Sequence, residues 1–103
     1  MTAEKEIIIK NKQGLHARPA AIFVQIANKY ESEIIVRKGK EEVSGKSIMG
    51  ILMLAAEEGS VVHIKAEGAD AEKAVKELES VLIGQTDDIT MPELGSNKKK
   101  KNI

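Results

Sequence analysis

The sequence contains no cysteine and no tryptophan, and Phe23 and Tyr30 are its only aromatic residues. Without cysteine, disulfides and thiolate chemistry are excluded. The usual zinc-site patterns fail as well, because the only two histidines, His16 and His63, lie 47 positions apart. So few aromatic side chains cannot form a stacking platform for single-stranded nucleic acid. We therefore expect an aliphatic core, no metal and no cofactor.

Neither sign of charge is in excess, since 16 Lys and Arg residues balance 16 Asp and Glu residues. This balance argues against a general polyanion-binding surface and against a nucleic-acid partner. No apolar run reaches the length of a membrane span, and residues 1–6 are polar, without a signal-peptide core. The sequence therefore predicts a cytoplasmic protein that does not insert into a membrane.

The length of 103 residues, with 42% hydrophobic and 31% charged residues, indicates one globular domain. Its C-terminal part differs in composition. Residues 86–103 contain Pro92, Gly95 and four consecutive lysines and have no apolar periodicity. We expect a domain over residues 1–85 and a disordered, solvated extension over residues 86–103.

Hydrophobic periodicity predicts four strands, over residues 6–10, 33–38, 42–44 and 60–66. It predicts three helices, over residues 17–28, 47–56 and 70–82, with Ser47 and Asp70 as N-caps of the last two. The elements do not alternate strictly, which favours an α+β fold with helices on one face of a largely antiparallel sheet. Ala20, Phe23, Val24 and Ala27 form the apolar stripe that marks the first helix as amphipathic. One face of the last strand, expected to be covered, carries Val62, Ile64 and Ala66. The buried stripe of the last helix is Ala74, Leu78, Val81 and Leu82.

The segment most informative about function is residues 14–20, Gly-Leu-His-Ala-Arg-Pro-Ala, in which a glycine loop delivers His16 to the start of a helix. A helix N-terminus has unpaired N–H groups and the positive end of the helix dipole, so it favours an anion. Arg18 adds a charged donor fork suited to phosphate, and Pro19 stiffens the first turn. Taken by themselves, these residues fit a simple N-cap or loop histidine and a surface arginine better than a phosphate site, because a histidine and an arginine two positions apart at a helix start are not rare.

The longer run Asn-Lys-Gln-Gly-Leu-His-Ala-Arg-Pro-Ala-Ala, residues 11–21, closely resembles the active-site segment of the HPr family. These are the histidine-containing phosphocarriers of the bacterial phosphoenolpyruvate-dependent sugar phosphotransferase system. Residues 45–54 resemble the family's regulatory-serine helix, and residues 66–74 resemble its last strand-to-helix junction. The resemblance spans about residues 5–84 and implies an open-faced β-sandwich of four antiparallel strands with three helices over one face.

The resemblance also implies a role for each residue of the first motif. His16 would carry the phosphoryl group on a ring nitrogen, in the family Nδ1. Arg18 would hold the group, and the backbone N–H groups of Ala17 and Arg18 would bind its oxygens. Pro19 would fix the helix start. His63, on the wetter face of its strand, is expected to be solvated and without function.

The second predicted helix is apolar nearly all round, so it is either fully buried or a docking surface. We expect Ile51 and Leu54 to face the core. The resemblance favours exposure of the remaining apolar side chains beside the active histidine, as a surface for partner proteins. The predicted docking residues are Ala20, Ile48, Met49 and Leu52.

Ser47 has two interpretations: a helix N-cap, or a phosphorylation site whose added charge would disturb docking. The flanking Lys46-Ser47-Ile48-Met49-Gly50 resembles the sequence found in bacteria that use HPr kinase/phosphorylase.

The resemblance therefore implies a phosphoryl carrier, which we expect to be a monomer, rather than an enzyme with a small-molecule substrate. Its partners would be the first enzyme of the phosphotransferase system and sugar-specific IIA domains. An alternative is a regulatory module that binds a catabolite-control transcription factor or a kinase through phospho-Ser47 and the apolar helix. A third, a small ligand-binding domain, would need a concave apolar pocket.

Overall fold

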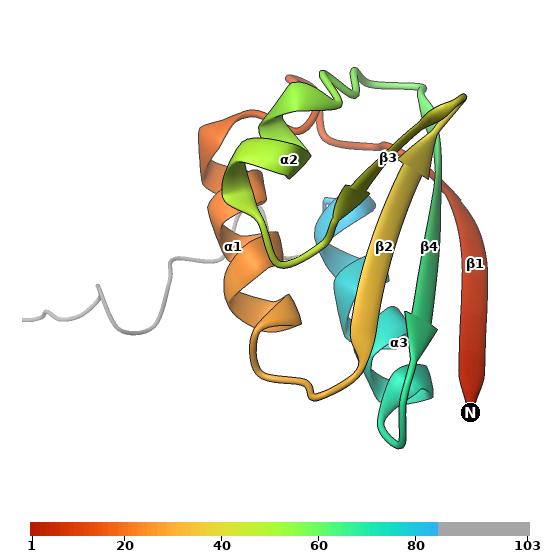
Figure 1. Ribbon diagram of the computed structural model, residues 1–103. Coiled ribbons are helices and arrows are strands. Elements are labelled where there is room, and N and C mark those ends of the chain that lie inside the picture. The colour runs from red at the N-terminus through yellow and green to blue at the C-terminus, as the bar shows by residue number, and fades with distance from the viewer. Residues whose placement is uncertain (85–103) are drawn as a thin grey trace, which may run out of the picture.

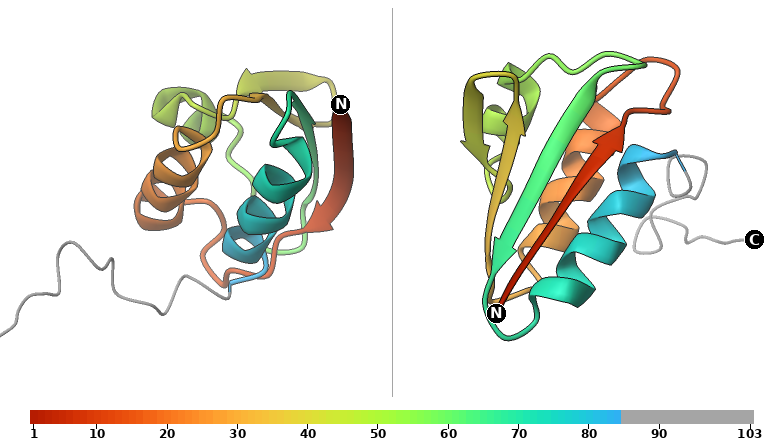
Figure 2. Two further views of the ribbon diagram at one scale, coloured as in Figure 1. Left: turned by 90° about the horizontal axis from the view of Figure 1, so that it is seen from below. Right: turned by 90° about the vertical axis from the view of Figure 1, so that its right-hand side faces the viewer.

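The computed structural model describes residues 1–84; the extension predicted for residues 86–103 lies outside them. Four antiparallel strands form one sheet in the order β1-β4-β2-β3, and three helices cover one of its faces (Figures 1 and 2). This is the predicted α+β architecture. The elements in chain order are β1 Thr2–Ile8, α1 Ala17–Ala27, β2 Glu33–Lys38, β3 Glu41–Ser44, α2 Ile48–Met53, β4 Val61–Glu67 and α3 Ala71–Leu82.

The core lies between the sheet and the helices and is almost entirely aliphatic, with Phe23 as its one aromatic residue among residues 1–84. The predicted stripe of α3 is completely buried, and so are the three predicted residues of β4. In α1, Val24 is only partly buried, and Ile22 is a core residue that the periodicity did not predict. No helix within residues 1–84 is long and apolar enough to cross a membrane.

Two predicted boundaries were wrong because pairing and turn geometry determine them. Strand β1 covers Thr2–Ile8 rather than residues 6–10. The whole strand, including its polar N-terminal half, pairs with β4, from Thr2 opposite Glu67 to Ile8 opposite Val61. Helix α2 ends at Met53 rather than at residue 56. The chain leaves it through Ala55, which has a left-handed φ of 50° that cannot continue a helix.

Asp70 precedes α3 as predicted, but its side chain makes no capping hydrogen bond to that helix. The carboxylate instead accepts hydrogen bonds from the backbone N–H groups of Glu31 and Ser32, at 3.0 and 3.1 Å, and from the Ser32 hydroxyl. Asp70 therefore holds the α1–β2 connection against the start of α3. The Ser32 hydroxyl and the two backbone donors lower the pKa of Asp70 below its ordinary value.

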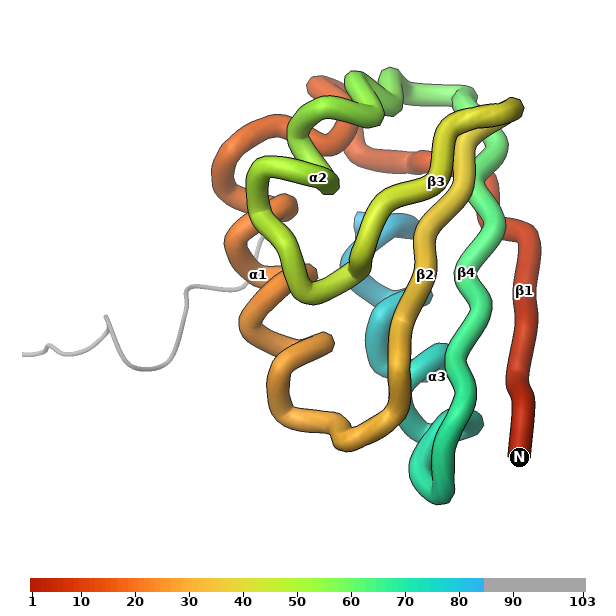
Figure 3. The backbone as a smooth tube through the Cα atoms, in the orientation of Figure 1, coloured from red at the N-terminus to blue at the C-terminus, as the bar shows by residue number. Residues whose placement is uncertain are grey.

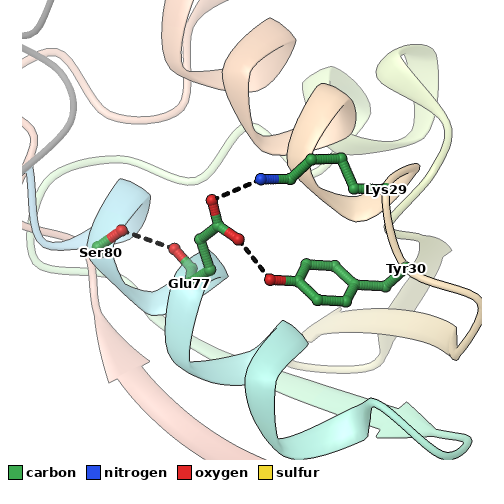
Figure 4. A network of polar contacts seen from close by, with 4 residues as sticks. All are labelled: Lys29, Tyr30, Glu77 and Ser80. Atoms are coloured by element: carbon green, nitrogen blue, oxygen red, sulfur yellow. Dashed lines mark hydrogen bonds and ion pairs between the residues drawn. The ribbon is translucent and has the colours of Figure 1, made fainter.

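A second polar cluster joins the end of α1 to the middle of α3 (Figure 4). The Glu77 carboxylate accepts hydrogen bonds from the Tyr30 hydroxyl and from Lys29 Nζ, the latter at 2.9 Å. The Ser80 hydroxyl donates to the Glu77 backbone carbonyl. The hydrogen bond to Glu77, together with burial, raises the pKa of Tyr30 to about 12. Burial opposes ionisation of Glu77, but the donors Tyr30 and Lys29 outweigh it and lower the pKa of Glu77.

We expect Asp70→Asn to lower the melting temperature at neutral pH and to flatten its decrease in acid. Because folding lowers the pKa of Asp70, its stabilising contribution is complete above the ordinary value of 3.8 and is lost as the pH falls through the folded-state value. Melting curves between about pH 2 and pH 7 measure this. Glu72→Gln, an exposed position in the first turn of α3, is the control. Identical pH profiles for wild type and Asp70→Asn would contradict the assignment.

Candidate functional site

The site begins where the chain leaves β1 and turns into α1. His16 is the N-cap residue, in an extended conformation, and its carbonyl accepts the first helical hydrogen bond from the Ala20 N–H at 3.0 Å. Gly14 makes the turn possible. It has a φ of 72°, and a Cβ at this position would lie 2.4 Å from the Ala56 carbonyl oxygen. Only glycine allows the loop to lie this close to the α2–β4 connection.

The first turn of α1 presents donors and positive potential. The imidazole of His16 makes no capping bond, and the first turn contains no acidic residue. The first N–H groups of a helix have no partner within it, so those of Ala17 and Arg18 are available for an external acceptor. Pro19 has no N–H and is buried, which fixes the backbone beneath them. Ala17 and Arg18 are exposed, and His16 is half-buried.

His16 and Arg18 line the same solvent-open depression of about 700 Å³. No acidic residue of the described chain lines it, and none of the ion pairs within residues 1–84 involves its cations. Its surface is therefore electropositive, which suits a phosphoryl group or the carboxylates of a partner protein. The depression is lined by Lys10, Asn11, Lys12, Gln13, His16, Arg18, Ile83 and Gly84.

Sequence reasoning missed Lys10 and Lys12 as part of this surface. The signal was present, because the two lysines lie directly before the glycine loop. Asn11 between them is 3% exposed, and neither polar atom of its side chain has a hydrogen-bond partner. Its burial could not be predicted, since it arises where the end of β1 meets the end of α3.

These residues can carry out nucleophilic chemistry on phosphorus. A neutral imidazole has a ring-nitrogen lone pair and is one of the side chains that form covalent intermediates. Arg18, which lines the same depression, and the N–H groups at the start of α1 are donors that suit the negative charge of a transferred group. Within residues 1–84, no group of three acidic or histidine side chains could hold a metal ion.

Helix α2 lies beside α1 and exposes the predicted apolar surface (Figure 1). Ile48, Met49 and Leu52 are 40%, 65% and 37% exposed, and Met53, which was not predicted, is also exposed. Ile51 and Leu54 are buried, as expected. We call the four exposed side chains the α2 patch. It begins directly after Ser47, whose hydroxyl accepts a hydrogen bond from the Gly50 N–H at 3.0 Å, so the predicted N-cap is confirmed.

Two expectations about individual residues do not fit the structure. Ala20 is fully buried in the core, because it faces inward from the first full turn of α1; it cannot contact a docked partner. His63 is not freely solvated: its ring is partly buried, and Nε2 lies 2.7 Å from a Glu4 carboxylate oxygen. His63 alternates along β4 with buried Val62 and Ile64, so it lies on the sheet face that the helices do not cover. It is not among the residues that line the depression.

Residues 3–83 match the family model described as the PTS HPr component phosphorylation site. The chain belongs to the HPr family. It is 43% identical over 81 residues to phosphocarrier protein HPr of Neisseria meningitidis, covering 79% of this chain and 91% of that protein. It is 47% identical over 75 residues to HPr-like protein Crh of Halalkalibacterium halodurans, and the match covers 73% of this chain and 89% of that protein. The crystal structure of HPr-C-His from Thermoanaerobacter tengcongensis matches this chain with a TM-score of 0.79 and 49% identity, and the match covers 84% of this chain and 97% of that one.

The HPr match includes every residue of the depression up to Ile83 and the whole α2 patch. The similarity to solved HPr structures confirms the predicted open sheet with three helices on one face. Membership of the family makes the chain a phosphocarrier-type protein of the phosphotransferase system.

The exposure of Met49 predicts that Met49→Asp changes the free energy of unfolding by only about 0.5 kcal/mol, as surface substitutions usually do. Ile51→Ala, two residues further on and fully buried, should cost about 2–5 kcal/mol. Urea unfolding of both variants measures the difference. A loss of several kcal/mol in Met49→Asp would place that side chain in the core.

Proposed function

We propose that the protein is a phosphoryl carrier in the cytoplasm. His16 accepts the group from the first enzyme of the phosphoenolpyruvate-dependent phosphotransferase system and passes it to sugar-specific IIA domains. The observation that carries this proposal is the position of His16: a half-exposed N-cap, next to Arg18, at the edge of an electropositive depression. The chain has no small-molecule substrate of its own in this scheme.

The transfer is a displacement at phosphorus between two histidines. A ring-nitrogen lone pair of neutral His16 forms a P–N bond as the P–N bond in the first enzyme breaks, and the electrons of that bond return to the donor imidazole. Negative charge spreads over the three equatorial oxygens, where Arg18 and the N–H groups of Ala17 and Arg18 stabilise it. Passage to an acceptor repeats the same steps with His16 as the leaving group.

Both partners must bring a histidine within bonding distance of His16, so an open site is required rather than a closed pocket. The α2 patch provides the adjacent apolar contact. Methionine side chains suit a surface that fits several partners in turn, because they are flexible and polarizable. We propose that donor and acceptor proteins both dock on this patch, and that the protein acts as a monomer.

We expect His16→Ala to abolish the uptake of acid-labile phosphate from phosphoenolpyruvate and a matched first enzyme, because the nucleophilic nitrogen is gone. His63→Ala is the matched control, since it removes the other histidine of the chain and should be phosphorylated at the wild-type rate. Mass-spectrometric mapping at neutral or alkaline pH locates the phosphate. Undiminished uptake by His16→Ala would refute the proposed carrier function.

Ser47 is proposed as a regulatory phosphorylation site for an HPr kinase/phosphorylase. Phosphorylation would add about −1.5 to −2 charges at the border of the α2 patch. Direct repulsion between this charge and phospho-His16 is small in water, about 0.4 kcal/mol for unit charges about 10 Å apart. Most of the inhibition would therefore come from weaker docking of the first enzyme.

Ser47→Asp should raise the concentration of carrier needed for half-maximal activity of the first enzyme by about tenfold, or about 1.4 kcal/mol. The melting temperature should barely change, because aspartate is also a good N-cap. Thr2→Asp, at the exposed start of β1, adds the same charge far from the patch and serves as the control. If Ser47→Asp is phosphorylated on His16 as readily as wild type, Ser47 is a helix cap only.

The solution structure of Crh, described as the Bacillus subtilis catabolite repression HPr, is 38% identical to this chain with a TM-score of 0.65. It favours a second candidate, a regulatory module that binds a transcription factor or kinase through phospho-Ser47 and the α2 patch. The presence of His16 and Arg18 in one depression favours the carrier. The His16→Ala experiment separates the two, because a purely regulatory module does not require phosphate uptake from the first enzyme.

A further inference from the structure

Two backbone hydrogen bonds anchor the loop that presents His16. At its start, the Lys10 N–H donates to the Leu82 carbonyl at the end of α3, at 2.9 Å. Near its end, the Leu15 N–H donates to the Ala56 carbonyl, at 2.8 Å. Leu15 directly precedes His16, so the second anchor sets the position of the N-cap. In Figure 3 the two segments that it joins, the loop after β1 and the connection after α2, run side by side.

The second anchor has little freedom to adjust. Gly14 lies so close to the Ala56 carbonyl that a Cβ would come within 2.4 Å of its oxygen and 2.9 Å of the Glu57 Cα. A displacement of the Ala56 peptide therefore moves the loop with it. The position of His16 depends on how the chain leaves α2.

Lys38, at the end of β2, forms hydrogen bonds to the segment where the chain leaves α2, which we call the α2 exit. Its ammonium donates to the Leu54 carbonyl at 3.3 Å and to the Ala55 carbonyl at 3.4 Å. These carbonyls belong to the end of α2, where orphan acceptors and the negative end of the helix need a cation. The last turn of α2 contains no basic residue of its own, so Lys38 supplies the charge from another strand.

The α2 exit contains a residue with an unfavourable backbone conformation, which other contacts must stabilise. Ala55 has a left-handed φ of 50°, which is unfavourable for a residue with a Cβ. Its side chain is exposed, so no packing of that side chain holds the conformation. The two hydrogen bonds from Lys38 flank this turn and oppose its relaxation.

We propose that Lys38 is a positioning residue for His16, acting through the Ala55 turn, the Ala56 carbonyl and the Leu15 N–H. Lys38 touches neither the phosphoryl group nor a partner in this scheme. Lys38 fixes the position of His16 relative to the α2 patch, so that His16 lies within reach of the reacting group of a partner docked on the patch. Its effect on transfer rests on the proposed carrier function, whereas its effect on the loop does not.

The test compares hydrogen exchange at the two anchoring amides. Lys38→Met keeps most of the aliphatic stem and removes the donors; we expect the Leu15 amide to exchange about three- to tenfold faster while the Lys10 amide is unchanged. Lys38→Arg should restore slow exchange, because guanidinium can also donate to both carbonyls. Lys40→Met, an exposed lysine in the following turn, is the matched control and should change neither amide.

Kinetics of phosphorylation by the first enzyme complete the test. Lys38→Met should lower kcat about three- to tenfold with little change in KM, since the α2 patch is intact but His16 is less well positioned. Equal acceleration at Leu15 and Lys10 would show general destabilisation and overturn the proposal, as would unchanged exchange at Leu15. Faster exchange at Leu15 with unchanged kcat would also overturn it. Absence of phosphorylation in the wild type would refute the carrier function and leave the exchange result valid.

Discussion

The contact between Gly14 and the Ala56 carbonyl is the constraint on which the functional end of the molecule depends. It joins the loop after β1 to the connection after α2, two segments about 40 residues apart in sequence. A side chain at position 14 would push them apart and would shift the start of α1, where His16 is the N-cap, relative to the end of α2. The proposed phosphorylation site and the surface that would recognise partners thus share one backbone contact, although they belong to different helices.

Much of the fold followed from sequence because the periodic elements also carry the core. The stripe of α3 and the alternation of β4 were predicted correctly, since both faces of each element differ strongly in polarity. The polar half of β1 could not be predicted. Residues 2–5 contain little β-forming sequence and become a strand because β4 offers them a partner of matching length. In the same way, Asp70 was correctly placed before α3, but its preferred donors come from the distant Ser32 segment.

At the candidate site, His16 and Arg18 could be predicted to lie together because a short, specific run carries both of them. Their surroundings could not be predicted. Lys10 and Lys12 join the depression through the turn after β1, and Ala20 leaves the surface because the first turn of α1 packs inward. Lys38 could not be connected with His16 from sequence at all, since the connection passes through three backbone groups of other segments. Residue identity predicts such a site better than it predicts which side chains support it.

The direction of β1 gives the molecule two functionally different poles. The strand begins at Thr2 and ends near the loop that presents His16, so the amino terminus lies at the end opposite the start of α1 and the α2 patch (Figure 1). The seven residues of β1 place the amino terminus roughly 20 Å from the beginning of the loop that leads to His16. A fluorophore, an affinity handle or a surface tether attached at Met1 is thus held clear of docking partners by a strand of the sheet itself, and an immobilised molecule would present its reactive pole to solution.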